Sequence, residues 1–277
     1  MKNIRIDYHT GTGGSEWIAR LLAEKLKNNN CNVVVNRIFR DHINGVEEID
    51  ADYYILIFPV HSFCAPKPVY EWVEHLAGNR CKTALISVSG GGNVVTNTAS
   101  RWKTVKLLKK SNFNVIYEEM IRMPNNWMKA PKEEKYKSIL SKIPNKIEKV
   151  TQTVLSEKRS KKIIYWFDYL ISALGEAEKS GTNKFGAGIK VLDTCTGCGL
   201  CAKNCCSSNI QMETEADLHA KPKFGNRCDM CLGCIYNCPK KALQATYGAF
   251  QVDKNGYDLR EMLKSIEKYN CKKTLHK

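Results

Sequence analysis

The sequence of 277 residues lacks any apolar run long enough to cross a membrane. Its most apolar stretches, Tyr53 to Val60 and Ile163 to Leu174, are much shorter than the roughly 20 residues that a spanning helix needs. The first residues, which begin Met1-Lys2-Asn3-Ile4, also lack the continuous apolar stretch of a signal peptide. We therefore expect no membrane span and a cytoplasmic protein, in whose reducing surroundings the 13 cysteines stay free of disulfides.

Acidic residues are scarce relative to basic ones. The chain has 43 Lys and Arg against 28 Asp and Glu, a formal charge of +15, and residues 101–190 alone hold 20 basic and 9 acidic groups. Such an excess could attract nucleic acid, an anionic membrane or an acidic protein, or it could simply keep a helix face soluble. Because no RNA- or DNA-binding motif is present and no regular array of aromatics accompanies the lysines, we expect no nucleic-acid partner.

The first half of the chain alternates strand-like and helix-like patterns, which predicts an α/β fold with a doubly wound parallel sheet of five strands. The expected strands are Lys2 to Tyr8, Asn32 to Ile38, Tyr53 to Val60, Thr83 to Ser89 and Asn114 to Met120. The expected helices are Ser15 to Asn28, Val69 to Leu76, Thr98 to Lys110 and, broken or kinked at Pro144, Pro131 to Leu155. The polar stretch from Phe39 to Asp52, between the second and third strands, is too short for a full crossover helix, so we expect a shortened helix there.

A glycine- and threonine-rich loop joins the first strand to the first helix. It reads Thr10, Gly11, Thr12, Gly13, Gly14 and Ser15. Glycines let backbone N–H groups converge on an anion, the helix amino terminus favours negative charge, and the three hydroxyls can donate to phosphate oxygens. The loop lacks the Lys of a P-loop and the G-x-G-x-x-G spacing of dinucleotide-binding proteins. It therefore predicts a phosphate site, but supports neither of these two classes of nucleotide-binding site.

Two runs of cysteine in the second half follow C-x2-C-x2-C-x3-C spacing. The first is Cys195, Cys198, Cys201 and Cys205, and the second is Cys228, Cys231, Cys234 and Cys238. In this spacing three thiolates wrap one 4Fe-4S cluster and the fourth ligates the other cluster. The pattern therefore predicts one cluster on Cys195, Cys198, Cys201 and Cys238, and a second on Cys228, Cys231, Cys234 and Cys205.

Two alternatives concern these metal ligands. Paired C-x2-C motifs also bind zinc, but a zinc site has no use for the third and fourth cysteine of each run. The first run ends in Cys205-Cys206, with cysteine where proline is expected, so Cys206 could replace Cys205 as a ligand. We favour Cys205 because only Cys205 keeps the x3 spacing.

Together, the glycine loop and the cysteine runs resemble fusion proteins in which a flavodoxin-like domain precedes a bacterial-type two-cluster ferredoxin domain. Tyr8 to Ser15 is similar to the phosphate loop of flavodoxins, with Gly14 where that family most often has Asn. Met123-Pro124-Asn125-Asn126-Trp127 looks like a further element of the fusion proteins. The resemblance implies an FMN cofactor, the strand order 2-1-3-4-5, and a smaller α+β domain for the clusters.

The resemblance also implies which other residues border the flavin ring. In the loop after the third strand these are Val60, His61, Ser62 and Phe63. In the loop after the fourth strand they are Ser89, Gly90, Gly91 and Gly92.

The expected domain organisation has four parts. Residues 1–157 form the flavodoxin-like domain and 158–189 a basic and aromatic linker, which includes the glycine-rich run from Gly175 to Gly188. Residues 190–250 form the cluster domain and 251–277 a tail with a short helix. The aromatic stretch Ile163 to Leu170 is expected to pack one domain against the other rather than to meet a membrane.

These expectations lead to electron transfer between FMN, two 4Fe-4S clusters and a redox partner protein, which the basic charge predicts to be acidic. An alternative is an enzyme, an FMN-dependent reductase of a small molecule, in which His61 is a candidate proton donor because histidine titrates near neutral pH. An ordinary loop histidine is the simpler interpretation of His61. A third alternative, a redox sensor that binds nucleic acid through residues 101–190, ranks last.

Overall fold

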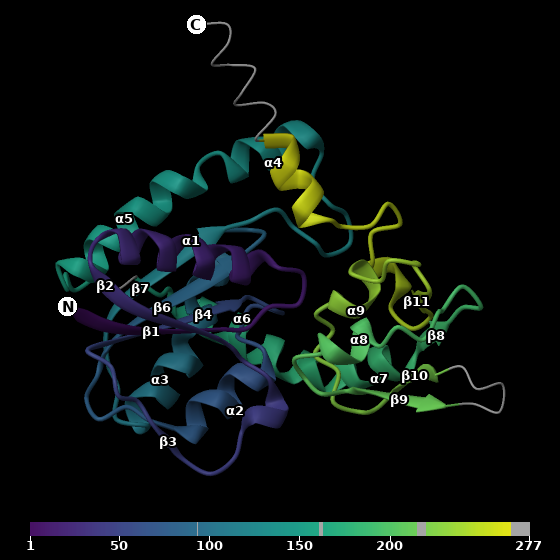
Figure 1. Ribbon diagram of the computed structural model, residues 1–277, viewed down its shortest axis with the longest axis horizontal. Helices are drawn as coiled ribbons and strands as arrows, with labels where there is room; N and C mark the ends of the chain where they lie inside the picture. The colour runs from purple at the N-terminus through teal and green to yellow at the C-terminus, as the bar shows by residue number, and fades with distance from the viewer. Residues whose placement is uncertain (93, 161–162, 215–219, 267–277) are drawn as a thin grey trace, which may run out of the picture.

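A computed structural model of the chain describes residues 1–92, 94–160, 163–214 and 220–266. Figure 1 shows a larger unit built from the first part of the chain and a smaller unit built from residues around 190–250. Among the described residues, no helix combines the length and the apolar character that crossing a bilayer requires.

The larger unit is organised around a five-stranded parallel sheet. Its strand order is β2-β1-β4-β6-β7, which is 2-1-3-4-5 when the five strands are numbered along the chain. The predicted fold class is therefore confirmed. The strands are β1 (Lys2–Tyr8), β2 (Cys31–Arg37), β4 (Tyr53–Pro59), β6 (Lys82–Ser89) and β7 (Asn114–Arg122). Because the strands are parallel, the loops that follow β1, β4 and β6 all leave at one edge of the sheet.

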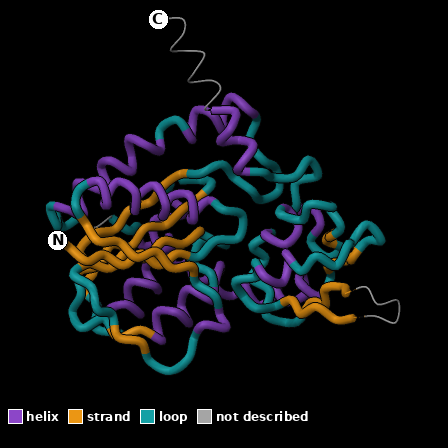
Figure 2. Tube along the Cα trace, viewed as in Figure 1, coloured by secondary structure: helices purple, strands orange, loops and turns teal. Residues whose placement is uncertain are grey.

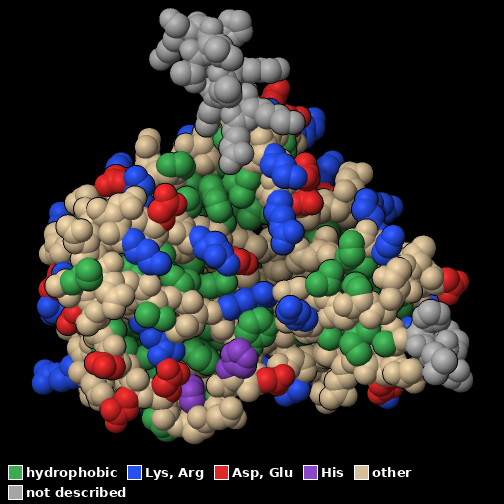
Figure 3. All heavy atoms as spheres, in the orientation of Figure 1, with side chains coloured by type: hydrophobic (Ala, Val, Ile, Leu, Met, Phe, Trp, Pro, Cys, Tyr) green, Lys and Arg blue, Asp and Glu red, His purple; other side chains and the backbone are tan. Residues whose placement is uncertain are grey.

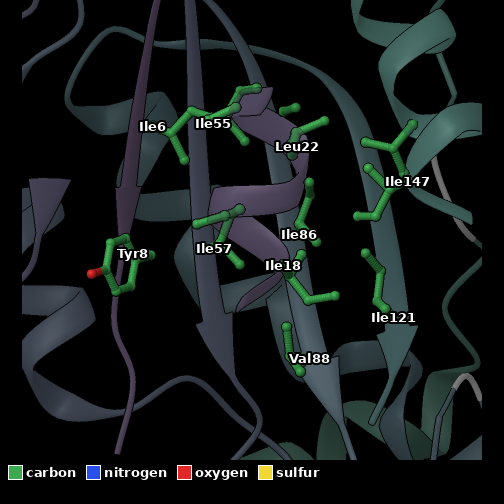
Figure 4. Packing of buried hydrophobic residues seen from close by; sticks show 14 of the residues in the cluster. Ile6, Tyr8, Ile18, Leu22, Ile55, Ile57, Ile86, Val88, Ile121 and Ile147 are labelled. Carbon is green, nitrogen blue, oxygen red and sulfur yellow. The ribbon is translucent and has the colours of Figure 1, made fainter. Parts of the chain in front are cut away.

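Helices cover both faces of this sheet (Figure 2). One face packs on α1 and α5, and Figure 4 shows isoleucines of β1, β4 and β6 pointing toward Ile18 and Leu22 of α1. Each fully buried side chain of this kind contributes about 1.5–3 kcal/mol. The other face packs on α2 and α3. The helices are α1 (Gly14–Asn28), α2 (Lys67–His75), α3 (Trp102–Lys110) and α5 (Ile143–Leu155).

Three connections refine the predicted elements. The crossover from Phe39 to Asp52 is abbreviated as expected, with a 3-10 turn η1 (Arg40–His42) and a two-residue strand β3 (Glu47–Glu48) that pairs with β5 (Leu76–Ala77). The helix expected from Thr98 begins as the 3-10 helix η2 (Val95–Arg101) before α3. The helix expected from Pro131 is divided into α4 (Glu133–Leu140) and α5, and Pro144 is the second residue of α5, where proline is tolerated.

The smaller unit is α+β, with the order strand, helix, strand, strand, helix, strand. The first and last strands pair with each other, as do the two middle strands, and both pairs are antiparallel. Each cysteine run leads into one of the short helices, so the unit consists of two similar halves. The elements are β8 (Ile189–Val191), α8 (Leu200–Lys203), β9 (Ile210–Thr214), β10 (Ala220–Phe224), α9 (Gly233–Tyr236) and β11 (Leu243–Ala245).

The segment between the units, which was expected to be a linker, is helical. It forms α6 (Trp166–Glu178), the 3-10 turn η3 (Lys179–Gly181) and α7 (Thr182–Ala187). Glycines in this segment allow close packing rather than chain flexibility, because Gly175 lies against Ser62 and Gly186 lies against Cys228.

The aromatic stretch also packs differently from expectation. The side of α6 that faces the larger unit carries Asp168, Ser172 and Gly175, whereas Trp166 is 75% exposed and Leu174 is 71% exposed. Tyr169 of this stretch packs edge to face on Trp102 of α3, with ring centroids 5.2 Å apart, so part of the stretch does contact the larger unit. Lys161 and Lys162 of the preceding basic run lie outside the described residues.

The region expected to be a tail packs back on the larger unit. After the 3-10 turn η4 (Ala249–Gln251), residues 259–266 are helical, and Leu259, Met262 and Ile266 are buried in the core beside α1. Residues 267–277 of the expected tail lie outside the described residues. The domain boundaries at 157, 189 and 250 stay predictions.

Candidate functional site

A cavity of about 330 Å³ lies at the carboxyl ends of the parallel strands, and both units line it. Most of the residues predicted to hold a flavin are brought together there. They are Thr10, Gly11, Thr12, Gly14, Ser15, Val60, His61, Ser62, Phe63, Ser89, Gly90 and Gly91. The predicted residues Gly13 and Gly92 do not line the cavity, although each belongs to a lining loop.

The loop from Thr10 to Ser15 has the geometry of an anion cradle. Gly13 adopts a left-handed conformation with φ of 90°, and its N–H donates a 3.0 Å hydrogen bond to the Thr10 hydroxyl oxygen. The amide of Asn126 donates to the Thr12 hydroxyl at 2.8 Å. The Ser15 hydroxyl is buried and has no hydrogen-bond partner among the described residues. An unpartnered buried hydroxyl at a helix amino terminus fits a ligand that accepts hydrogen bonds, as a phosphate does.

The loop after β4 contains a strained turn. His61 and Cys64 exchange backbone hydrogen bonds of 2.9 and 3.0 Å. Between them, Ser62 has φ of 44° and Phe63 has φ of 60°. Two consecutive positive φ angles define a turn that favours Asn and Gly, so Ser and Phe are costly there. Strain of this kind concentrates at binding sites, and Phe63 lines the cavity.

The loop after β6 is fixed by an amide and by the segment that follows β7. The Asn97 amide donates to the Ser89 hydroxyl at 3.0 Å and to the Gly92 carbonyl at 3.1 Å. A Cβ on Gly90 would lie 3.0 Å from Asn125, so glycine allows this close approach.

Sequence reasoning missed many of the cavity residues. The sequence singled out Met123 to Trp127 but assigned this segment no role in the site. The residues of η3, of the second cysteine loop and Tyr257 have no local sequence pattern that places them at the cavity, because their position depends on how distant segments pack. The additional lining residues are Pro59, Pro66, Val88, Val94, Thr96, Asn97, Met123, Pro124, Asn125, Asn126, Trp127, Glu178, Lys179, Thr182, Asp229, Met230, Cys231, Leu232 and Tyr257.

A buried lysine supplies positive charge to this cavity. Lys179 donates hydrogen bonds to the carbonyl of Ala65 and, at 2.8 Å, to the carboxylate of Glu176. Burial opposes ionisation of Glu176, but hydrogen bonds from Lys103, Lys179 and Tyr70 outweigh it and lower the pKa of Glu176 to about 2. The Glu176 carboxylate is therefore ionised at neutral pH.

Two histidines near the cavity are held neutral. Burial and then the charge of Lys179 lower the pKa of His61 to about 4, against a hydrogen bond to the backbone of Asp229. Burial lowers the pKa of His9 to about 3, and electrostatic repulsion from His61 and Arg37 adds smaller shifts in the same direction. The two rings meet edge to face with centroids 6.4 Å apart. The prediction of His61 at the cavity is consistent with its position, but its depressed pKa leaves it uncharged near pH 7.

The cysteines of the first predicted set line one small cavity in the smaller unit. Cys195, Cys198, Cys201 and Cys238 contribute to its wall, together with apolar residues such as Leu200 and Pro222. The Cys238 sulfur accepts a 3.3 Å hydrogen bond from the backbone N–H of Ala242. Cys238 and Cys234 of the second run therefore both lie beside the first run.

The second predicted set is also gathered from both runs. Burial raises the pKa of Cys228 to about 12 and raises those of Cys231 and Cys234, and the nearby Cys205 thiol adds to each shift. Backbone N–H groups donate 3.3 Å hydrogen bonds to two of the sulfurs, from Asn209 to Cys205 and from Met230 to Cys228.

The Cys206 thiol points elsewhere. It donates to the Thr10 carbonyl at 3.1 Å and accepts a hydrogen bond from Arg37 at 3.3 Å. Cys64 belongs to neither predicted cysteine set. Its thiol is buried, which raises its pKa to about 12 and makes the thiol unreactive.

Within the described parts of the chain, no group of three or more His, Cys, Asp or Glu side chains is placed to hold a single metal ion. Four thiolates around one zinc ion at 2.3 Å would lie about 3.8 Å from one another. The iron–sulfur assignment stays a prediction.

No family model and no curated protein matches the sequence. Solved flavodoxin structures resemble part of it. A flavodoxin variant from Fusobacterium nucleatum bound to flavin mononucleotide is 19% identical, with 57% of this chain and 98% of the flavodoxin covered and a TM-score of 0.41. A flavodoxin variant from Pseudomonas aeruginosa is 8% identical, with coverages of 55% and 98% and a TM-score of 0.39. The two-electron reduced flavodoxin of Megasphaera elsdenii is 18% identical, with coverages of 42% and 84% and a TM-score of 0.33. The fold assignment rests on the strand order of this chain itself.

Proposed function

We propose that the chain is an electron-transfer protein that binds FMN in the 330 Å³ cavity and two 4Fe-4S clusters in the smaller unit. One observation carries the proposal. The glycine loop and a cysteine of the second run, Cys231, line the same cavity. A flavin exchanges one or two electrons and each cluster exchanges one, so the three groups together suit a relay.

The residues present fit FMN. The unpartnered Ser15 hydroxyl and the loop from Thr10 would hold the phosphate. The glycines of the loop after β6 let backbone approach a flat ring, and Trp127 and Tyr257 add aromatic surface to the wall. A volume of 330 Å³ lies at the lower end of the range for small-ligand sites, which suits a single ligand.

The residues of the smaller unit fit two clusters. Cys195, Cys198, Cys201 and Cys238 would hold one, and Cys205, Cys228, Cys231 and Cys234 the other. The backbone N–H groups that donate to Cys205, Cys228 and Cys238 would raise the reduction potentials by stabilising negative charge on sulfur. We assign Cys205 rather than Cys206 as ligand because the Cys206 thiol is engaged by Thr10 and Arg37.

Anaerobic reconstitution tests the proposal directly. The reconstituted protein should contain about one FMN and about eight iron and eight sulfide per chain, and dithionite should produce the EPR signals of two 4Fe-4S clusters. A protein that binds no flavin, or that shows fewer than two clusters after full reconstitution, would contradict it.

A reductase acting on a small molecule is the second candidate function, because His61 lines the cavity and its Nδ1 has no hydrogen-bond partner among the described residues. Its pKa of about 4 makes it a weak acid catalyst at neutral pH. A His61→Ala variant that keeps electron transfer to viologen but loses turnover of a small substrate would favour the reductase. Equal retention of both activities would remove the catalytic role.

We also propose an acidic redox partner protein in the cytoplasm, since the chain carries a formal charge of +15. On the face shown in Figure 3, several Lys and Arg side chains lie near the junction of the two units. Association with such a partner should weaken steeply as salt is added.

A further inference from the structure

The glycine loop of the larger unit and the second cysteine loop of the smaller unit are packed backbone against backbone. A Cβ on Gly11 would lie 2.6 Å from the carbonyl oxygen of Cys231 and 2.7 Å from its Cβ. A Cβ on Gly233 would lie 2.5 Å from the carbonyl oxygen of Gly11. Both contacts are possible only because two glycines face each other. The Asn237 amide adds a 3.2 Å hydrogen bond to the same Gly11 carbonyl.

A second contact joins the neighbouring residue of the glycine loop to the end of the first cysteine run. The Cys206 thiol donates to the Thr10 carbonyl, and Arg37 of β2 donates to the Asn204 carbonyl at 3.0 Å. Arg37 thereby ties the larger unit to the chain on the amino-terminal side of Cys205. Cys205 and Cys231 belong to the same predicted cluster set, so both contacts bring that set against the glycine loop.

The other cysteine set has no described contact of this kind with the larger unit. The small cavity that its four cysteines line, together with Cys234 of the second set, is walled by described residues between 195 and 243, and none of them comes from the larger unit. Cys198 of this set is exposed, whereas Cys231, its counterpart in the second run, lines the cavity between the units.

We propose that Cys205, Cys228, Cys231 and Cys234 form the inner cluster site, with Cys231 as its point of contact with the FMN-phosphate loop. Cys195, Cys198, Cys201 and Cys238 then form the outer site, which faces the redox partner. This inference rests on the proposed function and adds the order of the sites to it. Nothing in the spacing of the cysteines distinguishes the two sets, because the runs are alike. The order follows from the contacts of Gly11 with Cys231 and of Thr10 and Arg37 with the residues on either side of Cys205.

The phosphorus nucleus of bound FMN can test this order without measuring turnover. In protein reduced fully with dithionite, a 4Fe-4S cluster is paramagnetic and the two-electron reduced flavin is not, so a nearby cluster broadens the 31P resonance of the flavin phosphate. We expect a broad resonance in the unaltered protein. Cys231→Ser should sharpen it several-fold, and the matched variant Cys198→Ser in the outer set should leave it broad.

Cys205→Ser provides a second variant of the inner set that does not touch Gly11. Each variant should retain about four iron per chain and one flavin, which shows that it has folded. A resonance that sharpens with Cys198→Ser, or that stays broad with both inner-set variants, would overturn the order of the sites. A protein with no bound flavin phosphate would instead contradict the proposed function itself.

Discussion

The α-carbon of Gly175 in α6 lies directly against the carbonyl oxygen of Ser62, so closely that any Cβ at position 175 would overlap that oxygen. The contact joins a helix that follows the larger unit to the loop that borders the candidate flavin cavity. It therefore couples the packing of α6 to the conformation of the loop that carries His61 and Phe63.

We expect Gly175→Ala to destabilise the protein by about 1–3 kcal/mol, although alanine normally favours a helix over glycine by about 1 kcal/mol. Gly181→Ala is the matched control, because no atom lies within 4 Å of a Cβ there and its φ is −79°. Urea unfolding of both variants would measure the difference. A Gly175→Ala variant as stable as the control would show that the helix shifts freely.

We expect Ser62→Gly to stabilise the protein by about 1 kcal/mol, because glycine adopts positive φ without the steric cost that a Cβ brings. The φ of Ser62 is 44°. Ser138→Gly in the exposed part of α4 should have the opposite sign and cost about 0.5–1 kcal/mol. Thermal unfolding would compare the two. A Ser62→Gly variant that is less stable would mean that the side chain contributes more than the strain costs.

Stability should fall as the pH decreases from about 6.5 toward 4, in part because of His9. Its folded pKa of about 3 lies below the unfolded value of about 6.5, so the unfolded state binds a proton that the folded state does not. The neutral ring contributes fully above pH 6.5, and about 2 kcal/mol of this contribution is lost by pH 5. Urea unfolding at pH 5, 6 and 7 should show a shallower pH dependence for His9→Gln.

An unchanged slope of the unfolding free energy against pH in His9→Gln would mean that His9 is protonated in the folded state.

We expect Cys206→Ser to keep about eight iron per chain and Cys205→Ser to lose part of them, since Cys205 lies near Cys228, Cys231 and Cys234, whereas Cys206 lies near Cys231 alone of these three and its thiol is engaged by Thr10 and Arg37. Iron and sulfide analysis after anaerobic reconstitution would distinguish the two variants. The reverse result would make Cys206 the ligand and would require its thiol to leave Thr10 and Arg37.

Reduction by an acidic partner should depend on the charge around the outer cysteine set. Lys240 lines the cavity of this set and is exposed, so Lys240→Glu should slow association with a reduced acidic ferredoxin roughly tenfold at low salt. Lys109→Glu, on the exposed side of α3, is the control. Stopped-flow spectroscopy would give both rates. Equal slowing by both substitutions would indicate a general effect of net charge rather than docking at the outer set.

The sequence predicts the core of the larger unit well, because buried parallel strands and amphipathic helices have distinct periodicities. The strand Lys2 to Tyr8 was predicted with its observed bounds, and the helix from Ser15 differs by one residue. Most of the glycine-loop and strand-end residues also proved to line the cavity. The crossed grouping of the cysteines stays a prediction, although Cys238 does lie beside the first run.

The contributions of distant segments could not be predicted from local patterns. Gly175 and Gly186 read as flexible because glycine breaks helices on average, and only the opposing chain shows why no Cβ is tolerated there. Lys179, Leu232 and Tyr257 line the cavity because of how three segments pack, and no spacing rule relates them to the glycine loop.

The placement of Tyr257 and Leu259 bears on when the protein can acquire a cofactor. Tyr257 forms part of the cavity wall, and Leu259 lies against the loop at Gly13, although both are more than 240 residues from that loop in sequence. The cavity wall is therefore incomplete until residues 257–259 have emerged from the ribosome. Flavin retention should begin only after synthesis has passed this point, and a fragment that ends before residue 257 should release FMN much faster than the chain of 277 residues does.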